Sequence, residues 1–144
     1  CGVPVVPGSD GPIDDLAGAR AFAAQHGFPL IIKAAMGGGG RGMRVVRDPA
    51  ELDEAFARAS SEARASFGDG TVFIERYVAD PRHIEVQILG DRTGELVHLF
   101  ERDCSVQRRH QKVIEAAPAL GLSDELRQAL YADALTLARR VGYE

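Results

Sequence analysis

A glycine-rich segment beside two cations is the part of this sequence best suited to bind an anion. The six residues of the segment are Gly37, Gly38, Gly39, Gly40, Arg41 and Gly42. Residues without a Cβ let their backbone N–H groups converge on an anion and approach it closely. Lys33 precedes the glycines and Arg41 lies among them, so both add positive charge. The segment therefore predicts a phosphate-binding loop.

Two better-known phosphate-binding loops do not fit this segment. Gly37, Gly39 and Gly42 have the G-x-G-x-x-G spacing of the dinucleotide fingerprint. That motif opens a helix, whereas β-forming residues follow here at 43–47. The P-loop requires Lys and then Ser or Thr after its last glycine, a place that Met43 and Arg44 hold in this chain. A strand–loop–strand flap over phosphates remains, and its alternative is a flexible hairpin turn, which usually needs fewer glycines.

A second polar set lies in the stretch 82–89, which alternates as a β-strand does. His83, Glu85 and Gln87 fall on one face of this strand, and apolar residues fall on the other. Three polar side chains on one strand face can together reach a ribose, a phosphate or a metal ion. The alternative is the solvent-facing side of a two-sided sheet.

The end of the preceding β-rich segment is a weaker candidate. Its residues are Glu75, Arg76, Tyr77 and Val78. An adenine ring can lie against strand backbone and pair its edge with main-chain N–H and C=O groups. A solvated strand end is the alternative.

The segment 102–112 has few groups to bury and many that bind anions. Gln107, His110 and Lys112 lie close together in it, so an irregular or extended backbone would bring some of them to one site. An exposed basic loop is the alternative. Cys104 has cations nearby that could lower the pKa of its thiol, but we expect it to be a small packed residue.

The elements that must position these residues follow from caps and periodicity. Carboxylates at Asp14 and Asp15 predict a helix that ends by Gly27, and Asp48 with Pro49 predicts the start of a second helix. The apolar stripe of this second helix is Leu52, Ala55, Phe56, Ala59, Ala63 and Phe67. Strands are expected at 30–36, 43–47, 71–77, 82–89 and 95–101, with a hairpin turn at 91–94.

A final helix is expected after Ser123, which has the side chain of a helix N-cap. The apolar positions of this helix are Leu126, Leu130, Ala134, Leu137 and Val141.

Composition sets the broad class. The chain has 144 residues with 45% hydrophobic content, enough for a packed core, and its net charge of -4 argues against a nucleic-acid or anionic-membrane binder. Two cysteines far apart predict neither a disulfide framework nor a zinc site, so we expect a reducing compartment, the cytoplasm or a mitochondrial matrix. The chain lacks an initiator Met and stops directly after a helix, so we expect an excerpt of a longer polypeptide.

Three motifs together give the chain a family resemblance. The segments 31–47, 81–87 and 101–112 resemble the biotin carboxylase component of biotin-dependent carboxylases, which are ATP-grasp enzymes. The resemblance implies an α+β ATP-grasp fold. Residues 1–76 would form the glycine-flap subdomain with a lead-in segment, and residues 77–144 the first part of the catalytic subdomain.

The resemblance also implies a reaction and roles for the residues. ATP and Mg²⁺ would activate bicarbonate as carboxyphosphate, and biotin on a carrier domain would accept the carboxyl group. Lys33 would contact the α- and β-phosphates under the glycine lid, and Lys112 would bind bicarbonate. Glu75 and the three residues after it would hold adenine. His83, Gln107 and His110 would contact ribose and phosphates, with Glu85 supporting the ribose or orienting His83.

The resemblance further implies what this segment lacks. Carboxylases of the family carry their magnesium ligands and the base for bicarbonate further downstream, so we expect the 144-residue chain alone to be inactive. A homo-oligomer is expected for the full-length form. Two alternatives stay open: a nucleotide-binding regulatory module without catalysis, and another ATP-grasp ligase such as carbamoyl phosphate synthetase, which explains 102–112 poorly.

Overall fold

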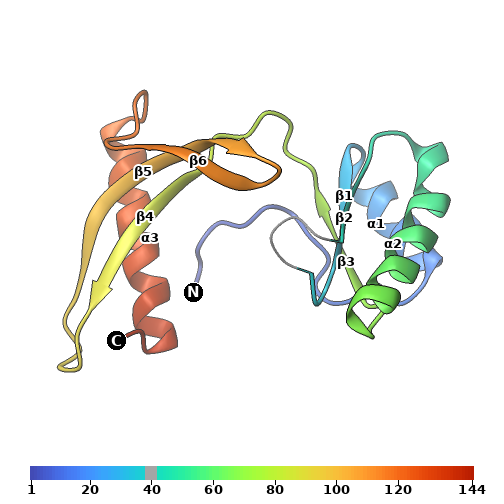
Figure 1. Ribbon diagram of the computed structural model, residues 1–144, viewed down its shortest axis with the longest axis horizontal. Helices are drawn as coiled ribbons and strands as arrows, with labels where there is room; N and C mark the ends of the chain where they lie inside the picture. Colours follow the sequence, from blue (N-terminus) through green and yellow to red (C-terminus); the bar gives the residue numbers. More distant parts are fainter. Residues whose placement is uncertain (38–41) are drawn as a thin grey trace. The chain divides into compact units, whose positions relative to one another are not determined.

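The chain forms two compact units in the computed structural model, which describes residues 1–37 and 42–144 (Figure 1). One unit, here the flap unit, comprises Val5–Ala79. The other, here the hairpin unit, comprises Asp80–Glu144 together with Cys1–Pro4. Gly38, Gly39, Gly40 and Arg41, which the sequence assigns to the phosphate loop, lie outside the described residues.

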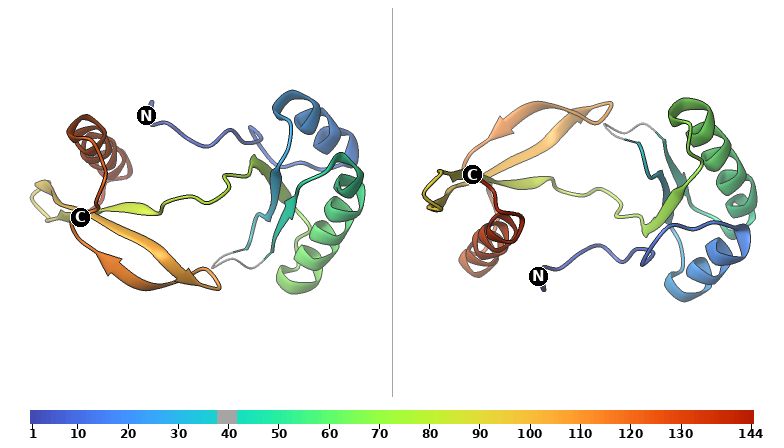
Figure 2. Two further views of the ribbon diagram at one scale, coloured as in Figure 1. Left: turned by 90° about the horizontal axis from the view of Figure 1, so that it is seen from above. Right: turned by 90° about the horizontal axis from the view of Figure 1, so that it is seen from below.

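The flap unit is an antiparallel three-stranded sheet with helices on one face. Its elements are α1 (Leu16–His26), β1 (Leu30–Ala34), β2 (Met43–Val46), the 3₁₀ turn η1 (Pro49–Glu51), α2 (Leu52–Phe67) and β3 (Val72–Arg76). The strand order is β2-β1-β3. Figure 2 shows α1 and α2 together on the same side of this sheet.

Local sequence signals account for the helices of the flap unit. The Asp15 side chain accepts a hydrogen bond from the Gly18 N–H at 2.8 Å, and Asp48 caps η1 in the same way through Ala50 at 2.8 Å. The expected apolar stripe of α2 is buried, except that Phe67 is half-buried. The first four residues of this stripe, from Leu52 to Ala59, join Leu30 and Ile32 of β1 in the core of the unit.

The hairpin unit is a second antiparallel sheet, of strands β4 (Ile84–Gly90), β5 (Leu96–Arg108) and β6 (Gln111–Ala116), with helix α3 (Asp124–Val141). The expected turn joins β4 to β5, where Asp91 accepts hydrogen bonds from Thr93 and Glu95. Ser123 caps α3 as expected, since its hydroxyl accepts from the Leu126 N–H. Among the described helices, none is both long and apolar enough to cross a bilayer.

The strand expected at 95–101 is longer than predicted, and of the two backbones left open for 102–112 the extended one is observed. β5 continues to Arg108 and returns as β6, so 102–112 is mostly hairpin. The tight turn consists of Arg109 and His110, whose φ angles are 51° and 65°. A two-residue turn with both φ angles positive suits a hairpin but usually contains glycine or asparagine. Without those residues, the sequence carried no turn signal here.

The apolar positions predicted for α3 are only partly buried. Leu126 and Val141 are 49% and 75% exposed, whereas Tyr131 and Ala138 are buried. The reason is a polar anchor: the Tyr131 hydroxyl donates to the carboxylate of Glu101 on β5, which is 1% exposed. This bond fixes which face of the helix meets the sheet.

Candidate functional site

An ion pair marks the face of the flap-unit sheet that the helices leave free. Lys33 Nζ lies 2.5 Å from Glu75 Oε2, and the Lys33 side chain is 36% exposed. Strand alternation explains the placement, because the neighbours of Lys33 on β1, Ile32 and Ala34, point into the core. The ammonium is therefore held on the open face, at the end of β1 that leads into the glycine segment.

The described ends of the glycine segment are fixed by backbone bonds to Ala34. The Ala34 N–H donates to Gly42 O at 2.8 Å, and the Gly37 N–H donates to Ala34 O at 3.0 Å. Gly42 has a φ of +72°, and a Cβ there would lie 2.7 Å from the Ala34 Cβ. Gly42 is therefore required both by its conformation and by the close approach of β1.

The proposed adenine segment offers fewer backbone groups than the sequence suggests. The Arg76 N–H donates to Pro7 O at 2.8 Å, and the Tyr77 N–H donates to Pro29 O at 3.0 Å. Val78 is half exposed and follows directly. Among the described residues, the N–H of Val78 donates to no backbone carbonyl, so it stays available to the edge of a ligand.

A second cluster lies on the hairpin unit, centred on the Glu85 carboxylate of β4. Its Oε1 accepts from Arg102 Nη2 at 2.5 Å, and its Oε2 accepts from Lys112 Nζ of β6. The hydrogen bond from Lys112, with a smaller contribution from Arg102, lowers the pKa of Glu85 to about 2. The same bond raises the pKa of Lys112. Both side chains are therefore charged at neutral pH, and Lys112 offers a positive ammonium.

Gln107 determines the proton position on His83. Gln107 Nε2 lies 2.9 Å from Cys104 O and 3.1 Å from His83 Nδ1. A carbonyl oxygen can only accept, so this atom of the amide is the nitrogen, and it donates to Nδ1. A neutral His83 then carries its proton on Nε2, which faces Glu85 Oε2 at 3.5 Å.

The structure brings together four of the residues that the sequence singled out on this unit: His83, Glu85, Gln107 and Lys112. His110 lies apart from these contacts, because it forms the hairpin turn. Cys104 is buried, and burial raises the pKa of its thiol, as expected of a packed residue.

Sequence reasoning missed Arg102, which it treated only as the start of a polar segment. Arg102 is the register partner of Glu85, and its Nη1 donates to Gln87 Oε1 at 2.9 Å. A second signal was also available in the composition. The chain has two lysines among its 17 basic residues, and these are Lys33 and Lys112.

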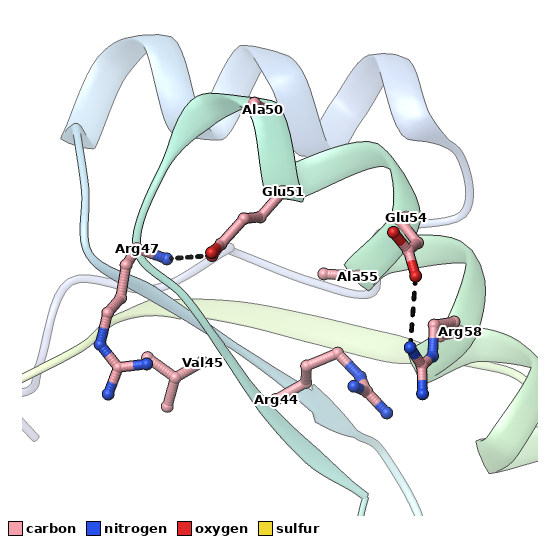
Figure 3. Close-up of a pocket in the computed structure, with 8 residues that line it drawn as sticks. All are labelled: Arg44, Val45, Arg47, Ala50, Glu51, Glu54, Ala55 and Arg58. Atoms are coloured by element: carbon pink, nitrogen blue, oxygen red, sulfur yellow. Dashed lines mark hydrogen bonds and ion pairs between the residues drawn. The ribbon is translucent and has the colours of Figure 1, made fainter.

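A pocket of about 360 Å³ lies elsewhere, between β2 and the start of α2 (Figure 3). Its charged lining residues are Arg44, Arg47, Glu51, Glu54 and Arg58. Arg58 donates to Glu54 at 3.2 Å, and Arg44 donates to Glu62 at 2.7 Å. Arg44 is on the strand face opposite Lys33 and Glu75, since it pairs in register with Ile32. This lining is a surface ion-pair array away from the glycine segment.

Comparison with known proteins is consistent with this arrangement. Residues 1–144 match the family described as "Carbamoyl-phosphate synthase L chain, ATP binding domain". The chain belongs to this family. It is 62% identical over 143 residues to a pyruvate carboxylase of Schizosaccharomyces pombe, and 59% identical to the mitochondrial enzyme of Homo sapiens. Each alignment includes 99% of this chain but only 12% of the relative's length, so the chain spans a small part of these relatives.

Solved structures give the same result for the fold. A biotin carboxylase of Campylobacter jejuni matches with a TM-score of 0.93 and 52% identity, over 99% of this chain and 32% of that one. A second match is the biotin carboxylase domain of a Hydrogenobacter thermophilus 2-oxoglutarate carboxylase, solved in complex with MgADP, ADP and bicarbonate. The TM-score is 0.90 and the sequence identity 46%, over 99% of this chain and 31% of that one. The α+β ATP-grasp fold expected from the sequence is confirmed.

Proposed function

We propose that the protein carrying this chain carboxylates biotin, using ATP and Mg²⁺ to activate bicarbonate as carboxyphosphate. The observation that carries the proposal is that each of the two lysines is held in an ion pair with a glutamate; the family resemblance assigns one lysine to the phosphates and the other to bicarbonate. The similarity to biotin carboxylase domains over 99% of the chain supports it. The acceptor would be biotin on a carrier domain.

Lys33 suits the phosphate role for physical reasons. It lies on the open face of the flap unit, half-exposed, at the strand end that leads into the glycine segment. Its ammonium is a compact charge with three donors, and Glu75 uses one of them. In this proposal Val5–Ala79 is the flap subdomain, and closing the glycines over ATP keeps water from a reactive mixed anhydride.

Lys112 suits the bicarbonate role. Glu85 uses one of its three donors, so the others are free to bind an anion. The positive charge would offset the negative charge that develops as a bicarbonate oxygen attacks the γ-phosphorus. His83 and Gln107, fixed beside it, are proposed to contact ribose and phosphates.

The residues described here do not fit Mg²⁺. Glu85, Cys104 and Glu115 are the one group of three or more donors close enough to share an ion among the described residues. Magnesium prefers six oxygen ligands, whereas this set includes a thiol, and Lys112 and Arg102 already bind the carboxylates. This cluster is therefore not a magnesium site in the proposed reaction, and the ligands proposed for Mg²⁺ lie outside this chain.

Among biotin-dependent carboxylases, pyruvate carboxylase is the proposed parent. The segments 98–105 and 115–119 resemble that enzyme most, with the biotin carboxylase subunits of acetyl-CoA and propionyl-CoA carboxylases as the alternative. Curated relatives named pyruvate carboxylase, from fungi, mammals and Bacillus subtilis, support the choice. A cytoplasmic or mitochondrial location and a homo-oligomer are part of the proposal.

Bicarbonate-dependent ATP cleavage by the complete protein tests the proposal. The wild type should release ADP in proportion to bicarbonate, and Lys112→Gln should reduce kcat/KM for bicarbonate by about 100-fold. Arg92→Gln, which removes an exposed charge at the 91–94 turn of the same unit, is the control and should keep the wild-type rate. ATP cleavage that is indifferent to bicarbonate in the wild type would contradict the proposal.

A further inference from the structure

Arg102 bridges all three strands of the hairpin unit. It lies on the central strand β5, and its guanidinium donates to Glu85 and Gln87 on β4. On the other side, its Nε lies 3.0 Å from Glu115 Oε2 on β6, an ion-pair contact. The Arg102 side chain is 30% exposed, so water screens these contacts only in part. None of the roles described above uses this residue.

The contact with Glu85 determines how that carboxylate is turned. Glu85 and Arg102 are direct register partners, and Arg102 binds Oε1 at 2.5 Å. A planar carboxylate with one oxygen fixed has its second oxygen fixed as well. Oε2 therefore points to the Lys112 ammonium, which it binds from the far side of β5.

Arg102 also affects the charge available at Lys112. Without Arg102, Glu85 would be free to turn both oxygens toward the ammonium and to neutralise it. With Arg102 present, the negative charge of Glu85 is shared between two cations. Lys112 is thus held in place by a partner that only partly offsets its charge, which favours binding of a small anion beside it.

We propose that Arg102 is a positioning residue, which acts through Glu85 to place the Lys112 ammonium and keep its charge available to the anionic substrate. The anion is bicarbonate if the proposed function holds, and to that extent the inference rests on it. Arg102 itself does not contact the substrate. Its planar fork reaches Glu85 and Gln87 together, which the single ammonium of a lysine cannot do at the same geometry.

Steady-state kinetics of the complete carboxylase test this role. Arg102→Gln should raise KM for bicarbonate about tenfold while KM for ATP changes by less than about twofold. Arg102→Lys retains the charge and should recover part of the loss. The control is Glu115→Gln, which removes another ion-pair partner of Arg102 but leaves the bond between Arg102 and Glu85. Its KM for bicarbonate should stay within about twofold of the wild-type value.

A double-mutant cycle separates positioning from general loosening. If Arg102 acts through Glu85, the double variant Arg102→Gln with Glu85→Gln should have a KM for bicarbonate no higher than that of Glu85→Gln alone. Fully additive losses would overturn the proposal. Equal rises in the KM values for ATP and bicarbonate, matched by a fall in Tm that Glu115→Gln shares, would overturn it too, because they would indicate a structural role.

An NMR measurement on the 144-residue chain requires no substrate. The order parameter of the Lys112 ε-methylene should fall in Arg102→Gln and stay unchanged in Glu115→Gln. The order parameter could fall as expected while the wild-type carboxylase shows no bicarbonate-dependent activity. That outcome would reject the proposed function but support the positioning role of Arg102. An unchanged order parameter in an active enzyme would reject the positioning alone.

Discussion

Tyr131 donates its hydroxyl hydrogen bond to Glu101, a carboxylate that is 1% exposed at the contact between α3 and β5. Arg127 donates to the same carboxylate at 3.0 Å, and the Ala119 N–H donates at 3.2 Å. A buried charge is tolerated only when it is paired and hydrogen-bonded. This cluster therefore constrains how the helix sits on its sheet.

Removing the hydroxyl tests that constraint. Tyr131→Phe retains the ring but leaves one oxygen of Glu101 without its donor, so we expect a loss of about 1–3 kcal/mol in the free energy of unfolding. Urea denaturation followed by circular dichroism measures it. Tyr143→Phe, at a half-exposed tyrosine of the same unit, is the control and should stay within about 0.5 kcal/mol of wild type. Equal stability of both variants would show that the hydroxyl bond is not a constraint.

Stability should fall in acid. The pKa of Glu101 is lowered, chiefly by the Tyr131 hydroxyl, and those of Glu85 and Asp103 are lowered to about 2, chiefly by Lys112 and by Ser105. A carboxyl whose pKa is depressed by folding stabilises the protein above its unfolded pKa, and that stabilisation is lost as pH falls toward the folded value.

The loss of stability should therefore begin near pH 4.5 and continue toward pH 2. Urea midpoints measured at pH 7, 4.5, 3.5 and 2.5 check this window. We expect Glu85→Gln to flatten the decline, because the variant has no proton to gain at that position. A midpoint that stays constant down to pH 2.5 would contradict the prediction.

Gly42 should tolerate alanine less well than another glycine of the same unit. Gly42 and Gly68 have φ angles of +72° and +78°, so an alanine is conformationally unfavourable at both. At Gly42 the new Cβ would also meet the Ala34 Cβ at 2.7 Å, whereas at Gly68 nothing lies within 4 Å. Gly42→Ala should lower the free energy of unfolding, measured by thermal denaturation, by at least about 1 kcal/mol more than Gly68→Ala does.

Lys33 should matter for the nucleotide and little for stability. Its ion pair with Glu75 is part-exposed, so Lys33→Gln should change the free energy of unfolding by less than about 1 kcal/mol. Binding of ATP, measured by calorimetry, should weaken about tenfold or more. Arg20→Gln removes a more exposed ion pair, with Asp53, in the same unit and serves as the control. Similar ATP affinities in both variants would remove Lys33 from the site.

The isolated 144-residue chain should not turn over. The ligands proposed for Mg²⁺ lie outside it, and Mg²⁺ is part of the proposed reaction. A purified sample should show no bicarbonate-dependent release of ADP above that of the same chain carrying Lys112→Ala. Turnover above this control would mean that the 144 residues suffice for catalysis.

The flap unit was predictable because its signals are local. Asp15 and Asp48 each cap a helix by accepting a hydrogen bond from an N–H two or three residues further along the chain. The apolar stripe on α2 repeats at helical spacing. The hairpin unit depends on contacts between distant residues. Its 109–110 turn lacks the usual glycine, and the orientation of α3 depends on a bond between residues 101 and 131.

The same difference explains what was found of the candidate site. The glycine segment, Lys33 and Lys112 stand out by type and spacing alone. Arg102 could not be recognised in that way, because its importance arises from strand register: it faces Glu85 only when β4 and β5 pair as they do. The interval of 17 residues between them carries no periodic signal.

The scarcity of lysine gives this chain a chemical handle. Fifteen of its 17 basic residues are arginines, which common acylating reagents leave unmodified at neutral pH. Amine-selective labelling would therefore modify side chains at two positions only, Lys33 and Lys112. Mass spectrometry of the two labelled peptides, with and without nucleotide or bicarbonate, would report occupancy at each place from the unmutated protein.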